Sequence, residues 1–188
     1  MSALVSESGA PPLSLAEARD WLRLGPGESD GHVAGLVRAA ASLCEAWTGQ
    51  MLVVREVTEE RDAAAGWMRL ARHPVVGIDA VLRLRDRAEP VLGPAEPVLV
   101  PADGWAVQMH GDGAAAVRLS GAAAGDRAQV RYRAGMAEHP SGVPEALRQG
   151  LLRLVQHWHF SGQEDERVPA IVTALWAPWR RVTLGVRP

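Results

Sequence analysis

Residues 143–162, VPEALRQGLLRLVQHWHFSG, carry the clearest helical pattern in the chain. Pro144 suits the first helical position, where no amide donor is needed, and Gly162 suits the residue after the last turn. Apolar residues recur at i, i+4, i+7, i+8 and i+11, which makes one stripe at 3.6 residues per turn. The stripe consists of Leu147, Leu151, Leu154, Val155 and Trp158. Burying each of them would contribute roughly 1.5–3 kcal/mol before entropy is subtracted. The pattern predicts a core-forming helix.

The same helix has further apolar surface away from the stripe. Leu152 and Phe160 project from the opposite side, and Gly150 lies on a thin flank. A glycine inside a helix costs about 1 kcal/mol relative to alanine, so close approach of another backbone is a candidate reason for Gly150. Two interpretations stay open. The helix is wedged between two layers of one domain, or Gly150, Leu152 and Phe160 form an interface with a second copy of the chain.

The length and the cysteine content limit the class of protein. A chain of 188 residues can bury one core, or one core with a modest second lobe, without a disulfide or metal. Cys44 is the only cysteine, and it lies on the apolar side of a predicted helix. We therefore expect a buried, unreactive thiol. No apolar run approaches a membrane span and no targeting segment is expected, so we predict a protein made in the cytoplasm with no membrane partner.

The charged residues argue against a dedicated nucleic-acid binder. All twenty basic residues are arginine, but the net charge is −2. Proteins that bind nucleic acid derive most of their affinity from neutralising phosphates, which needs a basic surface. A conduit through which DNA slides would need only weak attraction.

Two helices are predicted within residues 14–49, after a flexible arm at residues 1–13. Ser14 and Glu17 form an S-x-x-E capping box that opens the first helix. The second helix has an apolar arc and ends at Gly49. The arc consists of Val33, Leu36, Val37, Ala40, Leu43, Cys44 and Trp47.

From residue 51 to residue 135 the hydrophobic period changes from 3.6 to 2. The predicted strands cover residues 51–59, 78–85, 105–109, 116–120 and 130–134, and HGDG is predicted to be a hairpin turn. Such strands without intervening helices favour an antiparallel sheet, a small sandwich or a partial barrel. The predicted fold is therefore α+β, with a bundle of four helices, whose core is residues 14–49 and 143–162, and an inserted β lobe at 51–135.

Residues 163–188 form a separate C-terminal segment. Pro169 can open a short helix at residues 170–176, and Pro178 breaks it. Trp176 and Trp179 stand close to Arg180 in sequence, and aromatic and arginine side chains are the types most enriched at interface hot spots. Either the tryptophans fold back onto the helices or they contact a partner.

No sequence motif argues for an enzyme. His157 and His159 lie two residues apart on a predicted helix, so they point about 160° apart and cannot comfortably share one metal ion. No glycine motif fits a P-loop or a dinucleotide site, and G-x-S-x-G is absent. Adjacent carboxylates such as Glu59 and Glu60 are expected in solvated turns or strand ends. We expect no catalytic residues, no metal and no cofactor, and a hydrolase that uses His157 or His159 ranks last among our hypotheses.

The order of the segments resembles one known family. PLSLAEARDWLRL, a helix ending CEAWTGQML, strands closing on VRYRAG, the helix VPEALRQGLLRLVQHWH and the late LWAPWRR together are similar to head-to-tail connector proteins. These are also called adaptors or head-completion proteins of long-tailed phages and gene transfer agents. The likeness spans roughly residues 12–181. VRYRAG followed by a Val-Pro helix is its most specific part, and residues 63–102 match least.

The resemblance implies a structural protein of the particle neck, assembled in the bacterial cytoplasm, with no catalytic residues. Such a protein forms a closed, dodecameric ring beneath the capsid portal and extends the DNA channel toward the tail. The implied partners are other copies of the chain, the portal protein, a tail-side neck or stopper protein, and DNA that passes without sequence-specific binding. The family's C-terminal segment engages the portal. The matching residues here are Leu175, Trp176, Pro178, Trp179, Arg180 and Arg181.

An alternative hypothesis belongs to a different class. A DNA-associated packaging or regulatory protein would contact phosphates through its arginine-bearing strands. The candidate residues are Arg83, Arg85, Arg131 and Arg133. This hypothesis predicts binding that weakens steeply as salt is added.

Overall fold

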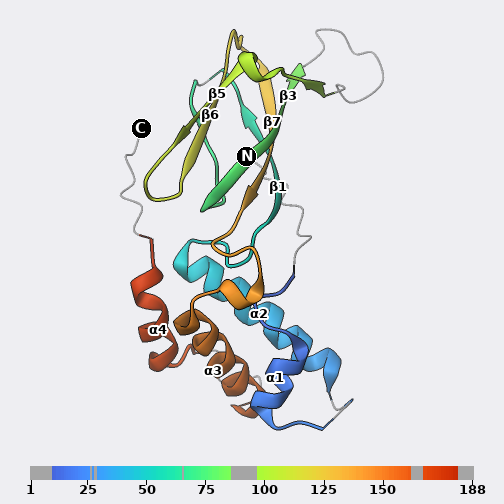
Figure 1. Ribbon diagram of the computed structural model, residues 1–188, viewed down its shortest axis with the longest axis vertical. Helices are drawn as coiled ribbons and strands as arrows, with labels where there is room; N and C mark the ends of the chain where they lie inside the picture. The colour runs from blue at the N-terminus through green and yellow to red at the C-terminus, as the bar shows by residue number, and fades with distance from the viewer. Residues whose placement is uncertain are drawn as a thin grey trace. The chain divides into compact units, whose positions relative to one another are not determined.

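The computed structural model describes residues 10–25, 27, 29–64, 66–85, 97–161 and 167–181. Several expectations lie outside the described residues: most of the arm at residues 1–13, the helix end at Gly162, residues 182–188, and the side chain of Arg85. The helices are α1 (Leu15–Leu22), α2 (Asp30–Thr48), α3 (Glu145–Ser161) and α4 (Ala170–Trp176), with 3-10 turns η1 (Ala102–Gly104), η2 (Pro140–Gly142) and η4 (Ala177–Trp179) (Figure 1). The strands are β1 (Arg55–Asp62), β2 (Met68–Arg69), β3 (Val75–Arg85), β4 (Val98–Leu99), β5 (Trp105–Met109), β6 (Ala115–Leu119) and β7 (Asp126–Ala134).

The described chain divides into two compact units. The β unit comprises residues 54–135, and the helical unit comprises residues 10–53 together with 136–181. The helices and two antiparallel sheets confirm the predicted α+β class. Within the described residues neither sheet closes into a barrel.

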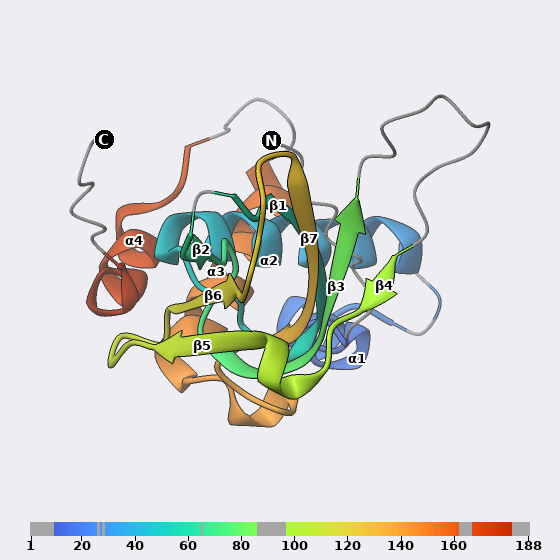
Figure 2. The ribbon, with the colours of Figure 1, turned by 90° about the horizontal axis from the view of Figure 1, so that it is seen from above.

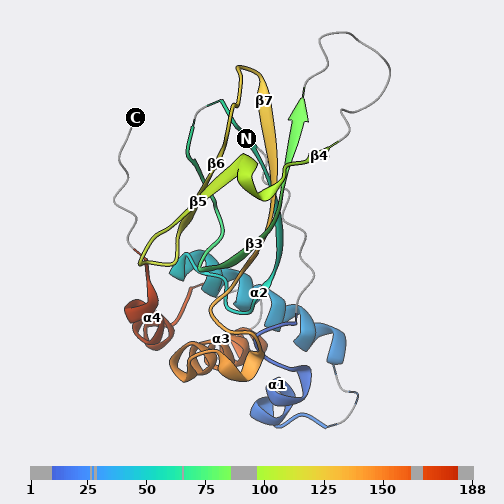
Figure 3. The ribbon, with the colours of Figure 1, turned by 45° about the horizontal axis from the view of Figure 1, so that its top comes forward.

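Helix α3 is the centre of the helical unit. It contacts each of the helices α1, α2 and α4 (Figures 1 and 3). Trp158, the last residue of the predicted stripe, is partly buried and packs against the core. The other four residues of the stripe are fully buried: Leu147, Leu151, Leu154 and Val155. The 3.6-residue period therefore identified the side of α3 that forms the core.

The predicted helix ends agree with the structure in most respects. The Ser14 hydroxyl accepts a hydrogen bond from the amide of Glu17 at 3.1 Å, which is half of a capping box. The Glu17 carboxylate instead pairs with Arg148 of α3, so it ties α1 to the central helix. Gly49 ends α2 in the left-handed conformation, as predicted. The apolar arc predicted for α2 includes Trp47, but the side chain of Trp47 is 36% exposed at the last turn.

The β unit contains two antiparallel sheets. One has the strand order β1-β7-β3-β4 and the other the order β2-β6-β5, and β5 runs across the direction of β3 and β7 (Figure 2). The hairpin β5–β6 turns at the predicted HGDG sequence. Strands β2 and β4 have two residues each, so a period of two could not reveal them.

A buried carboxylate occupies the interior of the β unit. Glu59 of β1 is fully buried, which contradicts its predicted place in a solvated strand end. Its carboxylate accepts hydrogen bonds from the Tyr132 hydroxyl at 2.8 Å, the Ala71 amide at 3.0 Å and the Arg61 guanidinium at 2.6 Å. The Arg72 amide donates to the Tyr132 oxygen at 3.1 Å. A buried charge is tolerated when its hydrogen bonds are made, and sequence spacing could not show these partners.

Candidate docking surface

Helix α4 is attached to the helical unit along one side. Pro169 precedes its first turn and accepts hydrogen bonds from the amides of Val172 and Thr173 at 2.9 and 3.3 Å. Val172 and Trp176, four residues apart, are the two buried residues of α4. They lie on one face because a helix repeats every 3.6 residues. This short helix is therefore held by its packing.

The indole of Trp176 lies directly on Gly150 of α3. A Cβ atom added to Gly150 would lie 2.1 Å from Nε1 of Trp176, closer than atoms can approach. The same Nε1 donates a hydrogen bond to the Leu147 carbonyl at 3.3 Å. The sequence suggested that another backbone approaches Gly150, but the close neighbour is the aromatic side chain of Trp176 in the same chain. Trp176, one of the predicted portal-contact residues, is inaccessible to a partner in this conformation.

The opposite side of α4 is exposed and apolar. Ile171 is 51% exposed, and it shares this surface with four smaller residues, Ala170, Ala174, Ala177 and Pro178. The sequence from Pro169 to Trp179 contains no charged residue. A solvated helix ordinarily presents charged or polar side chains on its outer side. We name this surface, residues 170, 171, 174, 177 and 178, the α4 face.

The segment after α4 continues over the C-terminal end of α2. The Gln50 side-chain amide donates to the Trp179 carbonyl at 2.7 Å, and the Arg181 amide donates to the Thr48 carbonyl at 2.9 Å. The Arg180 guanidinium lies over the ring of Trp47, 5.4 Å from its centre. This arrangement adds an arginine and an aromatic ring to the exposed surface of the helical unit.

The six predicted portal-contact residues therefore have different positions. Pro178 and Arg180 are exposed, Leu175, Trp179 and Arg181 are partly buried, and Trp176 is fully buried. Trp47 joins the exposed residues through its contact with Arg180, although its place in the apolar arc predicted a core position. A tryptophan in the last turn of an apolar helix gives no local sign of whether its partner is the core or an arginine.

The three residues predicted for a subunit interface do not form one surface. Gly150 and Leu152 are buried in the helical unit, where α3 lies among the other helices. Phe160 is 68% exposed beside a groove of about 480 Å³, which is also lined by Trp21 and Gln156. The two interpretations of this side of α3 thus apply to different residues: Leu152 is wedged within one unit, and Phe160 is available to a partner.

No family model matches the chain, and no curated protein matches it. Solved structures of gene transfer agent (GTA) particles do. A chain in the neck of an empty GTA particle, computed with C6 symmetry, is 27% identical over 98% of this chain and 100% of its own length, with a TM-score of 0.76. A chain in the native GTA neck, computed with C12 symmetry, is 27% identical over the same shares, with a TM-score of 0.72. A chain of the native GTA virion is 26% identical over 97% and 98%, with a TM-score of 0.71.

The resemblance to head-to-tail connector proteins is confirmed. The likeness of this connector-like chain to GTA neck chains includes both units, because it spans nearly all of the sequence. It therefore includes the β region that was the weakest part of the sequence resemblance.

The arginines proposed for DNA contact are split between two faces of one sheet. Arg83 pairs across the ladder with Ala128, a buried residue, and Arg131 pairs with Ala80 on the other face. Arg83 lies near Asp126 at 3.8 Å, and Arg133 forms an ion pair with Asp79 at 3.2 Å. Arg83 and Arg133 have acidic partners, and Arg83 and Arg131 lie on opposite faces, so these three arginines do not form a single basic surface.

The histidines and the cysteine show no shared site. Within the described ranges, no group of three or more His, Cys, Asp or Glu side chains is placed to hold a metal ion. Nδ1 of His157 lies 3.3 Å from the Ser161 hydroxyl on the same helix. Cys44 is buried, and this burial raises the pKa of its thiol well above the ordinary value, which suppresses the thiolate that a nucleophile needs. None of the described helices combines the length and the apolar character needed to cross a membrane.

Proposed function

We propose that this chain is a head-to-tail connector, an adaptor that forms a ring between the capsid portal and the tail of a phage-like particle. The observation that carries the proposal is the match to GTA neck chains over nearly the whole length of both chains. The C6 and C12 symmetry of those necks supports a ring of repeated copies, and a dodecamer agrees with the second of them. A ring of this kind would extend the DNA channel and meet a tail-side neck protein on its other side.

The α4 face is the part of the helical unit that we assign to the portal. Its exposed residues are apolar, and Arg180, two positions after Pro178, lies over the ring of Trp47. Interfaces gain most of their energy from such apolar, aromatic and arginine anchors. Trp176 fixes the orientation of α4, since its ring packs on Gly150 and the opposite side of the helix is exposed.

The portal assignment is tested by Ile171→Asp in cells that produce the particles. Because Ile171 is half exposed, the free energy of unfolding should change by no more than about 0.5 kcal/mol. A buried aspartate in a docking contact is costly, so this chain should be lost from purified heads and tails should not attach. Ala16→Asp, an exposed alanine on α1, is the matched control and should leave the particles intact. A normal share of tailed particles from Ile171→Asp would overturn the assignment.

The alternative function, a protein that binds DNA phosphates, has less support from the geometry of the arginines. It is tested by titrating the purified chain with duplex DNA at low salt, where phosphate contacts are strongest. We expect no saturable binding. Binding that is lost steeply as salt is added would favour the alternative.

A further inference from the structure

The two sheets of the β unit have edges of opposite chemistry. Strand β1 is one edge, and six of its eight residues, REVTEERD, are charged. Sheets commonly protect their edges with charged side chains because unpaired backbone groups would otherwise recruit another strand. Strand β5, WAVQM, is an edge of the other sheet and has no charged residue. The β5 edge lacks the protection that the β1 edge has.

The exposed side chains of β5 belong to the interior side of its sheet. Val107 pairs with Val117, and Met109 pairs with Ala115. Partners directly across an antiparallel ladder share a face, and both β6 partners are buried. Val107 is nevertheless 42% exposed and Met109 is 50% exposed. Among the described residues, the core-facing side of this sheet is therefore only partly covered at β5.

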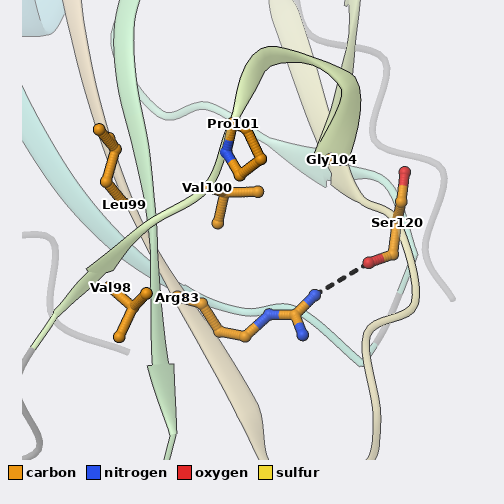
Figure 4. Close-up of a pocket in the computed structure, with 7 residues that line it drawn as sticks. All are labelled: Arg83, Val98, Leu99, Val100, Pro101, Gly104 and Ser120. Carbon is orange, nitrogen blue, oxygen red and sulfur yellow. Dashed lines mark hydrogen bonds between the residues drawn. The ribbon is translucent and has the colours of Figure 1, made fainter.

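An apolar groove lies beside β4, near the turn that precedes β5. It has a volume of about 390 Å³ and is lined by Val98 and Leu99 of β4, by Gly104 at the end of η1, and by Arg83 and Ser120 (Figure 4). The Arg83 guanidinium donates to the Ser120 carbonyl at 2.9 Å and so links β3 to the residue after β6. Both Val98 and Leu99 are exposed. The β unit therefore has a second region of exposed apolar surface at β4, although neither Val107 nor Met109 lines this groove.

The other edge of the β5 sheet also carries an exposed aromatic residue. The strand order β2-β6-β5 places β2 at that edge, and Trp67 directly precedes β2. The Trp67 ring is exposed, with the Arg118 guanidinium 4.9 Å from its centre. One sheet thus presents apolar surface at each of its two edges.

We propose that the β5 edge of one copy packs against the Trp67 edge of the next copy in the ring. A closed ring needs two different, complementary faces on each subunit, and this sheet supplies both. The absence of charge on β5 fits a protein contact and does not fit DNA. The inference rests on the proposed function, because it takes the second copy to be the neighbour in the connector ring.

The test places a photoreactive residue, p-benzoylphenylalanine, at position 109 of the full chain in assembled particles. Met109 is half exposed, so the bulky probe should not disturb the core. Irradiation should give a crosslinked pair of two copies of this chain, and mass spectrometry should map the second site to the segment around Trp67. The control probe replaces Val76, an apolar residue of the same unit that is 45% exposed, and should give no such pair.

The outcomes separate this inference from the proposed function. Crosslinks from position 109 to a different protein, to another segment, or to nothing, in particles that contain the chain at their neck, would overturn the edge contact and leave the connector proposal intact. Equal crosslinking from position 76 to the same segment would also overturn it. Particles that assemble without this chain would overturn the connector proposal and the edge contact together.

Discussion

The helical unit and the β unit stabilise their interiors in different ways. The helical interior is almost entirely apolar, and it includes the close contact of the Trp176 ring with Gly150. The β interior contains the charged Glu59, which is held by the Tyr132 hydroxyl and two other donors. The first interior depends on shape, and the second depends on hydrogen bonds and on Tyr132 keeping its proton. Substitutions and pH should therefore affect the two units differently.

Trp176→Ala should have the largest effect. Removing a fully buried indole loses its transfer free energy and leaves a cavity, which together cost about 3–5 kcal/mol. The measurement is the free energy of unfolding of the purified chain in urea. Trp67→Ala removes an exposed indole and should cost much less, so equal losses would contradict the account of the two tryptophans. If Trp176→Ala particles lost their tails, the cause would be the unstable fold of the chain and not a lost portal contact. Portal docking is therefore tested at Ile171.

Gly150→Ala should destabilise the chain by about 3 kcal/mol, at the upper end of the usual cost of overpacking. The new methyl group would meet the buried indole, which has little room to move. Gly35→Ala, in the interior of α2 with open space around it, is the control and should gain up to about 1 kcal/mol from higher helix propensity. A smaller ring, Trp176→Phe, should restore part of the stability of the Gly150→Ala chain. If Trp176→Phe gave no rescue, the loss of stability in Gly150→Ala would not come from the contact between residues 150 and 176.

Tyr132→Phe should cost about 1.5 kcal/mol at neutral pH, since a hydrogen bond to a buried carboxylate is lost. Burial, and then the neighbouring charge of Glu59, raise the pKa of Tyr132 above its ordinary value. The folded state therefore keeps the proton that the unfolded state loses, so stability is full below about pH 10 and falls as the pH rises further.

The measurement for Tyr132 is absorbance, because it is the only tyrosine in the chain. Tyrosinate should not form above pH 10 until the protein unfolds, and the urea stability of Tyr132→Phe should lose this part of the alkaline decline. Ordinary titration of the tyrosine in the folded protein would contradict a buried hydroxyl bonded to Glu59.

Sequence reasoning predicted best what depends on neighbours along the chain. The stripe of α3, the end of α2 at Gly49 and the start of α4 after Pro169 all follow from local periodicity and backbone preference. The buried Cys44 followed from its place on an apolar helix side. The order of such segments was enough for the resemblance to connectors, which the comparisons confirmed.

The candidate surfaces were predicted less well, because they depend on contacts between distant residues. The sequence allowed the same two interpretations for Trp176 and Trp179. Only the ring of Trp176 packs on a glycine of α3, and it also donates a hydrogen bond to Leu147, 29 positions away. Arg83 and Arg131 were grouped by type, although the register of their strands places them on opposite faces.

The sequence alone determined the helices, the approximate places of the longer strands, the buried thiol and the order of segments, because each depends on preferences that act over a few residues. Only the tertiary structure decided which apolar residues are covered. Glu59 is buried because Tyr132, 73 positions away, supplies a donor, and Val107 is exposed because no other described strand covers its side of the sheet. Burial is a property of the partners that a side chain meets, and those partners come together only when distant segments pack.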